Sequence, residues 1–208
     1  GLTLNSVLLT ALLRAAGETT DVGLSASIRP PRFQGMGNYA TGISVHFRYD
    51  EQTDFFSNAQ AIQKQIYEKL DNPAEKYYLL QFIGALAPTL IDATYFAAFD
   101  GYDNKSAITL RNVFGYDGKP VGISLTNLTR LEIQQQFGAV RLERLLFIPP
   151  LATNARRVFG VSTLGDCLSI AMHVEKSNEL DADVAMFRRA AACLRELPEA
   201  LDRTVPCP

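Results

Sequence analysis

The residues with the clearest potential for chemistry lie on one predicted strand, residues 121–127 (VGISLTN). Its apolar side chains alternate onto one face: Val121, Ile123 and Leu125. Ser124 and Thr126 lie on the other face, and Asn127, which we expect to end the strand, adds one more side-chain donor and acceptor. A small polar face of this kind is directed either to water or to a cleft that needs hydroxyl and amide groups.

The chain has only two histidines. His46 lies on the polar face of a second predicted strand, and His173 lies within a third. Neither is spaced from a cysteine, serine or aspartate in a way that indicates a nucleophile and base. We therefore expect structural or surface roles for both, and we retain His46 as a secondary candidate for the site.

Motifs for phosphates and metals are missing from the sequence. The pair Gly35-x-Gly37 has no third glycine and precedes a strand, so it does not fit a dinucleotide-binding loop. There is no HExxH or His-x-x-His motif, and Asp100 and Asp103 lack the ligand spacing of an EF-hand. The sequence predicts no metal site.

Composition narrows the class of protein. The chain has 208 residues, is 47% hydrophobic and 20% charged, and has a formal net charge of −2. These values predict one soluble globular domain, which we place at residues 1–198, with a loose tail at 199–208. They give no electrostatic basis for binding nucleic acid, and no apolar run is long enough to span a membrane.

Three observations bear on location and on the start of the chain. The three cysteines form no CxxC pair, which predicts a cytoplasmic protein with no disulfide framework or zinc site. The apolar stretch 2–16 lacks the basic flank of a signal peptide. The first residue is Gly1, and a helix follows at once, so we expect a glycine left by tag removal, a start within a larger protein, or both.

The predicted elements alternate between helices and strands. Helices are expected from the cap Thr3 to Gly17, from the cap Asp54 to residue 70, and over residues 73–86, 90–99 and 184–194. Strands or extended segments are expected at residues 22–28, 39–49, 107–114, 121–127, 140–148, 158–164 and 167–174, with a turn at 116–119. This order predicts an α/β layered domain with a mixed sheet flanked by helices. On these residues alone, a cleft binder and a structural scaffold both remain open.

Several segments, taken in order, resemble the C-terminal half of the chloramphenicol-acetyltransferase-like superfamily. That superfamily includes condensation domains of nonribosomal peptide synthetases, alcohol acetyltransferases and polyketide-associated acyltransferases. The resemblance rests on segments that span nearly the whole chain: LTLNSVLLTALLRA (2–15), LSASIRP (24–30), MGNYATGISV (36–45) with its Gly37-Asn38 turn, GISLTN (122–127) and CLSIAMHV (167–174). The fifth segment and the last helix look like the closing strand and helix. The fourth segment is most similar to the alcohol acetyltransferase branch, although Thr126 and Thr129 stand where Ser and Gly are usual.

The resemblance implies one half of a two-subdomain fold around a substrate tunnel. In that superfamily a histidine of an HHxxxDG motif in the first half is the general base, and the acyl donor is a thioester on coenzyme A or a carrier protein. This chain has no HHxxxDG motif, so it resembles the half that supplies a tunnel wall and, in some branches, a hydroxyl that steadies the oxyanion. The resemblance favours Ser124, Thr126 and Asn127 for that wall, with Asn38 and His46 as secondary candidates.

Two functions follow as alternatives. The first is the C-terminal subdomain of a thioester-dependent acyltransferase, inactive alone and partnered by the N-terminal half of the same protein. Its partners would also include a small-molecule acyl donor and a small-molecule acceptor, and it would have no covalently bound cofactor. The second is a non-catalytic binding or protein-interaction module that keeps the fold and covers its cleft face with a partner or by self-association. Ser124, Thr126 and Asn127 could equally satisfy nearby backbone groups, since such side chains commonly do so.

Overall fold

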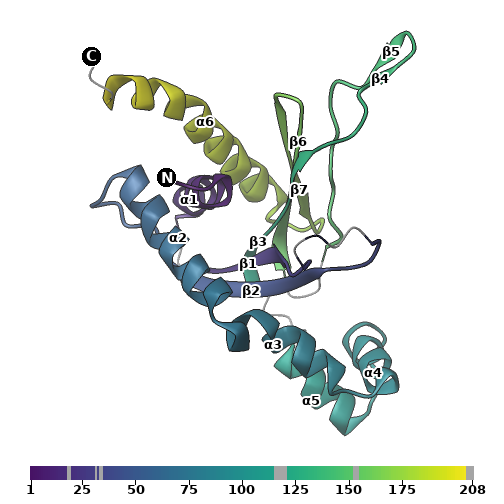
Figure 1. The fold of residues 1–208 in the computed structure, drawn as a ribbon. Helices are drawn as coiled ribbons and strands as arrows, with labels where there is room; N and C mark the ends of the chain where they lie inside the picture. Colours follow the sequence, from purple (N-terminus) through teal and green to yellow (C-terminus); the bar gives the residue numbers. More distant parts are fainter. Residues whose placement is uncertain (18–19, 31, 33–34, 115–120, 152–154, 205–208) are drawn as a thin grey trace.

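A single five-stranded sheet with helices on one face dominates the computed structural model (Figure 1). The structure describes residues 1–17, 20–30, 32, 35–114, 121–151 and 155–204. The strand order is β2-β1-β3-β6-β7, from Ala40–Phe47, Thr20–Ser27, Val121–Leu131, Ala155–Leu164 and Cys167–Val174. Strands β1, β3 and β6 are parallel to one another, whereas β2 and β7 run antiparallel at the two edges. This arrangement confirms the predicted mixed α/β sheet.

Alternating side chains divide this sheet into two different faces. In β2 every second residue is buried, and the buried set is apolar except for Thr41. Those apolar residues pack on helices α1 (Leu4–Ala16), α2 (Phe55–Asp71) and α6 (Leu180–Thr204), which all cover the same face (Figure 1). The core formed there includes Leu9, Leu13, Val22, Ile62, Ile123, Phe159 and Met186. The opposite face carries the small and polar residues.

The two helices that frame the core begin and end as the sequence predicts. The Thr3 hydroxyl accepts the backbone N–H of Ser6 at the start of α1, and Gly17 ends the helix in the left-handed conformation that favours glycine. Asp54 caps α2 through the N–H groups of Phe56 and Ser57. The hydroxyl of Ser57 and these N–H groups hold the pKa of the Asp54 carboxyl below its usual value. Helix α2 is thereby fixed so that its last turn reaches the edge of the sheet.

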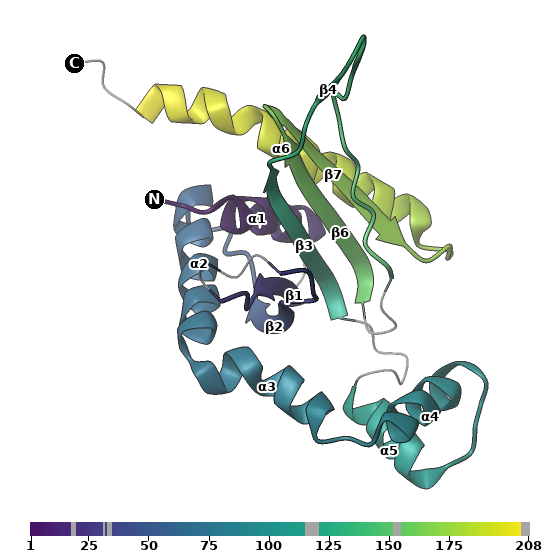
Figure 2. The same cartoon turned by 45° about the vertical axis from the view of Figure 1, so that its right-hand side comes forward.

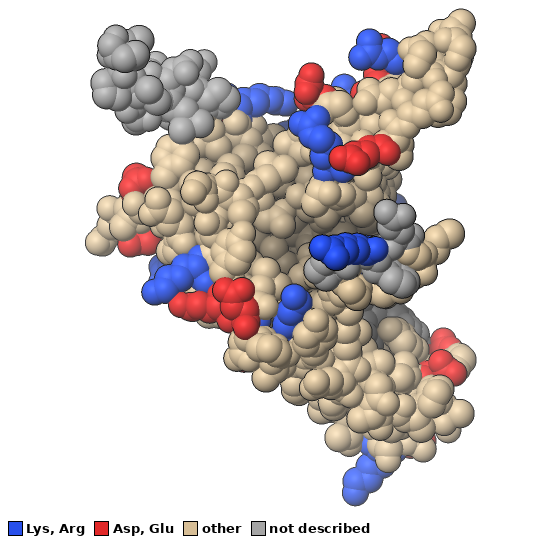
Figure 3. Space-filling model, in the orientation of Figure 1, with Lys and Arg blue, Asp and Glu red and all other residues tan. Residues whose placement is uncertain are grey.

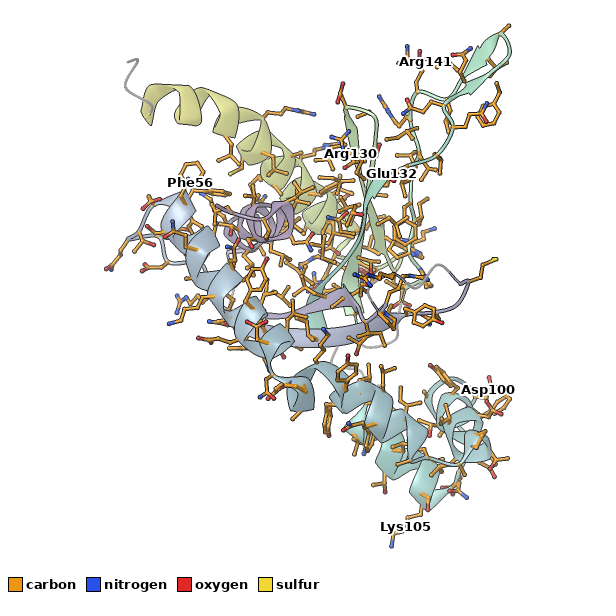
Figure 4. All side chains as sticks on the ribbon, in the orientation of Figure 1. Phe56, Asp100, Lys105, Arg130, Glu132 and Arg141 are labelled. Carbon is orange, nitrogen blue, oxygen red and sulfur yellow. The ribbon has the colours of Figure 1, made fainter. Side chains whose placement is uncertain are left out.

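Three further helices form an arm that extends beyond strand β2: α3 (Pro73–Gly84), α4 (Pro88–Phe99) and α5 (Lys105–Val113) (Figures 1 and 4). The extended segment predicted at residues 107–114 is wrong, because α5 occupies it. Asn104 caps this helix, and Ala107 and Leu110, one turn apart, are its buried residues. The predicted turn at residues 116–119 lies outside the described residues. No single described helix is long and apolar enough to cross a membrane; Pro73–Gly84 and Pro88–Ala98 together have the length and composition, but bend by 93°.

The strand predicted at residues 140–148 is also wrong. Only Val140–Arg141 (β5) pairs, with Gln136–Phe137 (β4), in a small hairpin at the tip of a projection that carries Arg141 (Figure 4). Residues 142–150 then return beside β6 and β7 without joining the sheet, and we call this segment the strap (Figure 2). Its apolar residues suggested a strand, but β3 and β7 already occupy both edges of β6.

Strand β3 is longer than predicted. It does not end at Asn127 but continues to Leu131, with a register shift against β6 between Asn127 and Arg130. Thr129 lies in that irregularity with φ of 61°, a conformation that is unfavourable for a β-branched residue. Beyond this irregularity β3 pairs with β6 again, through Arg130 and Leu131.

The C-terminal hairpin and helix close the domain. Strands β6 and β7 form the predicted hairpin, and Gly165 in their turn has φ of 55°. Helix α6 turns Asp183, Met186 and Ala190 inward, so its most buried stripe lies beside the predicted one at 184, 187, 191 and 194. The boundary predicted at residue 198 falls inside this helix, and a loose tail stays a prediction. Asp183 is 2% exposed and accepts a 2.6 Å hydrogen bond from Arg157, which ties α6 to β6.

Candidate functional site

The candidate site is the uncovered part of the small-residue face of the sheet. We call this part the open face and define it by six residues on β1, β2 and β3: Gly23, Ser25, Gly42, Ser44, Ser124 and Thr126. Register brings them together, because Gly23 pairs with Ser44 on one side and with Ser124 on the other. Residues directly opposite each other on neighbouring strands share a face. Three segments far apart in the chain thus place four hydroxyl groups on one surface.

A groove of about 510 Å³ lies over this face. Its floor includes Gly23, Ser25, Gly42, Ser44 and Ser124, and its wall comes from Lys69 of α2 and from Glu75, Tyr78 and Leu79 of α3. Helix α3 is held beside β2 because the Thr41 hydroxyl donates to the carbonyl oxygen of Lys76 at 3.0 Å. The volume lies within the range of small-molecule sites. Five of the six open-face residues contribute to this floor.

Ser124 has the strongest position among the predicted residues. It is half-buried on the groove floor, and a Cβ built on Gly23 would lie 3.5 Å from its hydroxyl oxygen. Neither Ser124 nor Ser44 makes a side-chain hydrogen bond to any other described residue. The alternative role, satisfying a nearby backbone group, is therefore not seen for Ser124 in the described part of the chain. Both hydroxyls keep their donor and acceptor capacity for a ligand.

Thr126 and Asn127 are placed differently. Thr126 lies on the open face and shares a 3.0 Å hydrogen bond with the hydroxyl of Ser25. Asn127 lies on the helix-covered face, where its amide donates to the Asn5 side chain at 2.7 Å and its oxygen accepts the backbone N–H of Thr129 at 2.7 Å. Asn127 thus holds the irregularity in β3 and satisfies local groups. The structure does not bring it to the groove.

The two secondary candidates lie beside the groove. Asn38 accepts the backbone N–H of Ala40 through its side chain and so shapes the entry to β2. His46 lies two residues beyond Ser44 on the same face of β2, with its Nδ1 2.7 Å from a carboxylate oxygen of Asp21. Sequence spacing missed this pair because it depends on the antiparallel register, which sets Asp21 directly opposite His46. Their side chains are 68% and 54% exposed, so the pair is well solvated.

Sequence reasoning also missed most residues of the groove floor and all residues of its wall. Gly23, Ser25, Gly42 and Ser44 repeat the small polar alternation that singled out residues 122–126, so their pattern could have indicated a shared face. Tyr78 and Leu79 gave no such signal, because a helix of tyrosines and leucines usually packs into a core. In this structure, however, no residue of α3 is fully buried.

The arrangement can hold a ligand by hydroxyl hydrogen bonds and apolar contact. The charged groups that line the groove are Lys69 and Glu75, which pair with each other at 3.1 Å. No group of three or more His, Cys, Asp or Glu side chains that could hold a metal ion occurs among the described residues. His173 is half-buried, and its Nδ1 lies 2.9 Å from the carbonyl oxygen of Pro149 in the strap.

Comparison with known proteins finds the likeness in structure and not in sequence. No family model matches the chain, and no curated protein matches it. Among solved structures, the cyclization-docking bidomain of the EpoB nonribosomal peptide synthetase from Sorangium cellulosum matches 95% of this chain with a TM-score of 0.58 and 17% identity. The epimerization domain from the third module of tyrocidine synthetase B matches 96% with a TM-score of 0.54 and 14% identity. A structure concerned with condensation domain-mediated chain release from the enacyloxin polyketide synthase matches 99% with a TM-score of 0.51 and 15% identity.

These matches show the fold. The chain has a condensation-domain-like fold, as the resemblance in its motifs predicts. It spans 37%, 42% and 38% of the lengths of the EpoB, tyrocidine synthetase and enacyloxin chains, so it corresponds to well under half of each. The likeness fits one subdomain of a larger fold.

Proposed function

We propose that this chain is the C-terminal subdomain of a thioester-dependent acyltransferase, and that its groove forms one wall of the acyl-transfer site. The donor would be a thioester on coenzyme A or a carrier protein, and the acceptor a hydroxyl, amine or thiol. The observation that supports this most directly is the Ser124 hydroxyl on the floor of the groove, which makes no side-chain hydrogen bond to another described residue. A hydroxyl held ready on a rigid strand is suited to stabilise the oxyanion that forms when a thioester carbonyl is attacked.

The general base of this reaction would lie outside the chain. The sequence has no HHxxxDG motif, and the fold likeness covers only part of each longer domain. The base would come from the N-terminal half of the same protein, placed over the open face. The likeness to the alcohol acetyltransferase branch, rather than to the condensation domains themselves, also belongs to this proposal.

The test compares the 208-residue chain with the full-length parent protein, using acetyl coenzyme A and a panel of alcohols and amines. We expect no acyl transfer by the chain alone. In the parent, Ser124→Ala should lower kcat by about 100-fold, the scale seen when one oxyanion donor is removed, with little change in the free energy of unfolding. Acyl transfer by the isolated chain that is lost on Ser124→Ala would overturn the division of labour proposed here.

A second function has support from the surface of the chain. Large apolar side chains are exposed on the β4–β5 hairpin and the strap, namely Phe137, Val140, Leu146 and Ile148, with exposures of 55%, 68%, 61% and 64%. Such a surface suits a non-catalytic interaction module that binds a partner or a second copy. Size-exclusion chromatography with light scattering tests it: a monomer at all concentrations, with no ligand-induced thermal shift, counts against this function.

A further inference from the structure

The wall of the groove is built around an aromatic side chain that other rings hold in place. Tyr78 of α3 lines the groove although it is 63% exposed. Its ring stacks on Phe82 one turn later, with 6.1 Å between centroids and 7° between planes. Phe82 in turn meets the ring of Phe114 edge to face at 5.6 Å. This row of three rings fixes Tyr78 where an isolated surface tyrosine would move between rotamers.

Two of the residues on the groove floor, Gly23 and Gly42, are glycines. A Cβ built on Gly42 would meet only the side-chain tip of Leu79, at 3.4 Å, and one built on Gly23 would meet the Ser124 hydroxyl at 3.5 Å. Neither position needs glycine to avoid a clash with backbone. The Leu79 side chain therefore lies close to the floor at Gly42, and the open volume of the groove lies beside this contact, over the other floor residues.

The groove offers a ligand no net charge. Lys69 and Glu75, the charged residues among those that line it, neutralise each other at 3.1 Å across the end of α2 and the start of α3. The surface of the arm seen in Figure 3 is also largely free of Lys, Arg, Asp and Glu side chains. The part of a ligand that lies under Tyr78 and Leu79 should therefore be uncharged and apolar.

We propose that this groove selects a medium-length apolar acyl chain over an acetyl group, with the alkyl part lying between the Gly23–Gly42 floor and the Tyr78–Leu79 wall. This inference rests on the proposed function and adds the class of acyl group. The hydroxyls of Ser44 and Ser124 would hold the carbonyl end, because these two floor hydroxyls make no side-chain hydrogen bond to another described residue. Each methylene group that leaves water on the floor adds affinity through apolar burial.

The test measures the affinity of the 208-residue chain for acetyl, butyryl, hexanoyl and octanoyl coenzyme A by isothermal titration calorimetry. We expect the affinity to rise about twofold to fourfold for each added methylene group, as burial of about 0.8 kcal/mol per group would give at most. Tyr78→Ala removes an aromatic ring from the groove wall, and Gly42→Val adds a branched side chain that meets Leu79 and narrows the groove. Both should flatten the rise with chain length.

Tyr102→Ala is the matched control, since Tyr102 is 49% exposed on the same arm but does not line the groove. It should leave the chain-length dependence unchanged, and thermal unfolding should confirm that every variant folds. Equal affinity for acetyl and octanoyl coenzyme A would overturn the inference but leave the proposed function standing. A rise with chain length that survives both Tyr78→Ala and Gly42→Val, or is lost in Tyr102→Ala, would also overturn it. Failure of every thioester to bind the chain would overturn the inference as well, whereas the acyl-transfer test on the full-length parent decides the proposed function separately.

Discussion

The two halves of the small-residue face of this sheet are built from similar residues but have different neighbours. On β6 and β7 this face carries Gly160, Ser162, Ser169, Ala171 and His173, together with the larger Val158 opposite His173, and the strap covers it. On β1, β2 and β3 the same types of residue form the open face, which no segment covers in the described part of the chain. A small-residue face is therefore not in itself a sign of a site.

The covered half shows how this surface accepts an extended segment. The carbonyl oxygen of Leu145 accepts the Ser162 hydroxyl at 2.8 Å, that of Phe147 lies against Gly160, and that of Pro149 contacts His173. Every second carbonyl of the strap thus faces the sheet, while Leu146 and Ile148 between them point outward and are exposed. On β6 the Ser162 hydroxyl is thus occupied, whereas those of Ser44 and Ser124 on the open face make no side-chain hydrogen bond to another described residue. The covered half is not fully satisfied either, because the buried Ser169 hydroxyl on β7 has no hydrogen-bond partner among the described residues.

The largest expected difference between the halves comes from their glycines. A Cβ on Gly160 would overlap the carbonyl oxygen of Phe147 and lie 2.5 Å from Cδ of Pro149. Gly160→Ala should lower the free energy of unfolding by about 3 kcal/mol, since overlap of the new Cβ with backbone cannot be relieved by a side-chain rotation. Urea denaturation measures this.

The matched variant on the open face is Gly23→Ala. Its new Cβ would make ordinary contact with Ser124 at 3.5 Å, so the free energy of unfolding should change by less than about 1 kcal/mol. Equal losses at Gly160 and Gly23 would remove the contrast between a packed and an open half.

The next comparison is between Ser162 on the covered half and Ser124 on the open face, by the free energy of unfolding. Ser162 is 1% exposed and satisfies a strap carbonyl, so Ser162→Ala should destabilise the protein by about 1–2 kcal/mol. Ser124→Ala should change the free energy of unfolding by no more than about 0.5 kcal/mol, because no described group loses a partner. A large loss of stability on Ser124→Ala in thermal or urea unfolding would assign this hydroxyl a structural role.

Strand β3 lies beside β6 at the boundary between the two halves. A substitution at its irregularity, at Thr129, should raise the free energy of unfolding, whereas the substitutions above lower it. Asparagine tolerates a φ of 61° better than threonine does, and the backbone N–H that Asn127 holds remains in place. Thr129→Asn should therefore stabilise the protein by about 1 kcal/mol, seen as a higher midpoint in urea. A lower midpoint would mean that the Thr129 side chain makes contacts that outweigh its backbone strain.

The smallest expected effect concerns the one hydroxyl pair on the open face. Thr126→Val removes its hydrogen bond to Ser25, which is exposed and should contribute about 0.5 kcal/mol to the free energy of unfolding. The released Ser25 hydroxyl would then resemble those of Ser44 and Ser124. We expect thioester affinity to be kept in Thr126→Val, and a loss of binding without a loss of stability would make Thr126 part of the ligand site.

Local patterns predicted most of the elements. Alternation identified β1, β2 and the β6–β7 hairpin, and the caps at Thr3, Gly17 and Asp54 set the ends of α1 and α2. The failures have a common cause. Residues 107–114 and 140–148 are short apolar runs that fit more than one structure, and neighbours distant in the sequence decide between them. Residues 107–113 belong to a helix because Ala107 and Leu110 pack in the arm. Most of residues 140–148 stay outside the sheet because β6 already has a neighbouring strand on each side.

The sequence by itself determined which residues are small and polar on alternating positions, and therefore that Ser124 and Thr126 share a face. It also determined that no general base of the expected motif is present. Only the tertiary structure decided which of these residues meet. The register of β1, β2 and β3 gathers the serines, the strap covers the matching surface on β6, and Asn127 turns to the helices. Periodicity fixes the direction of a side chain relative to its own strand, whereas its neighbours depend on strand order and on where distant segments pack.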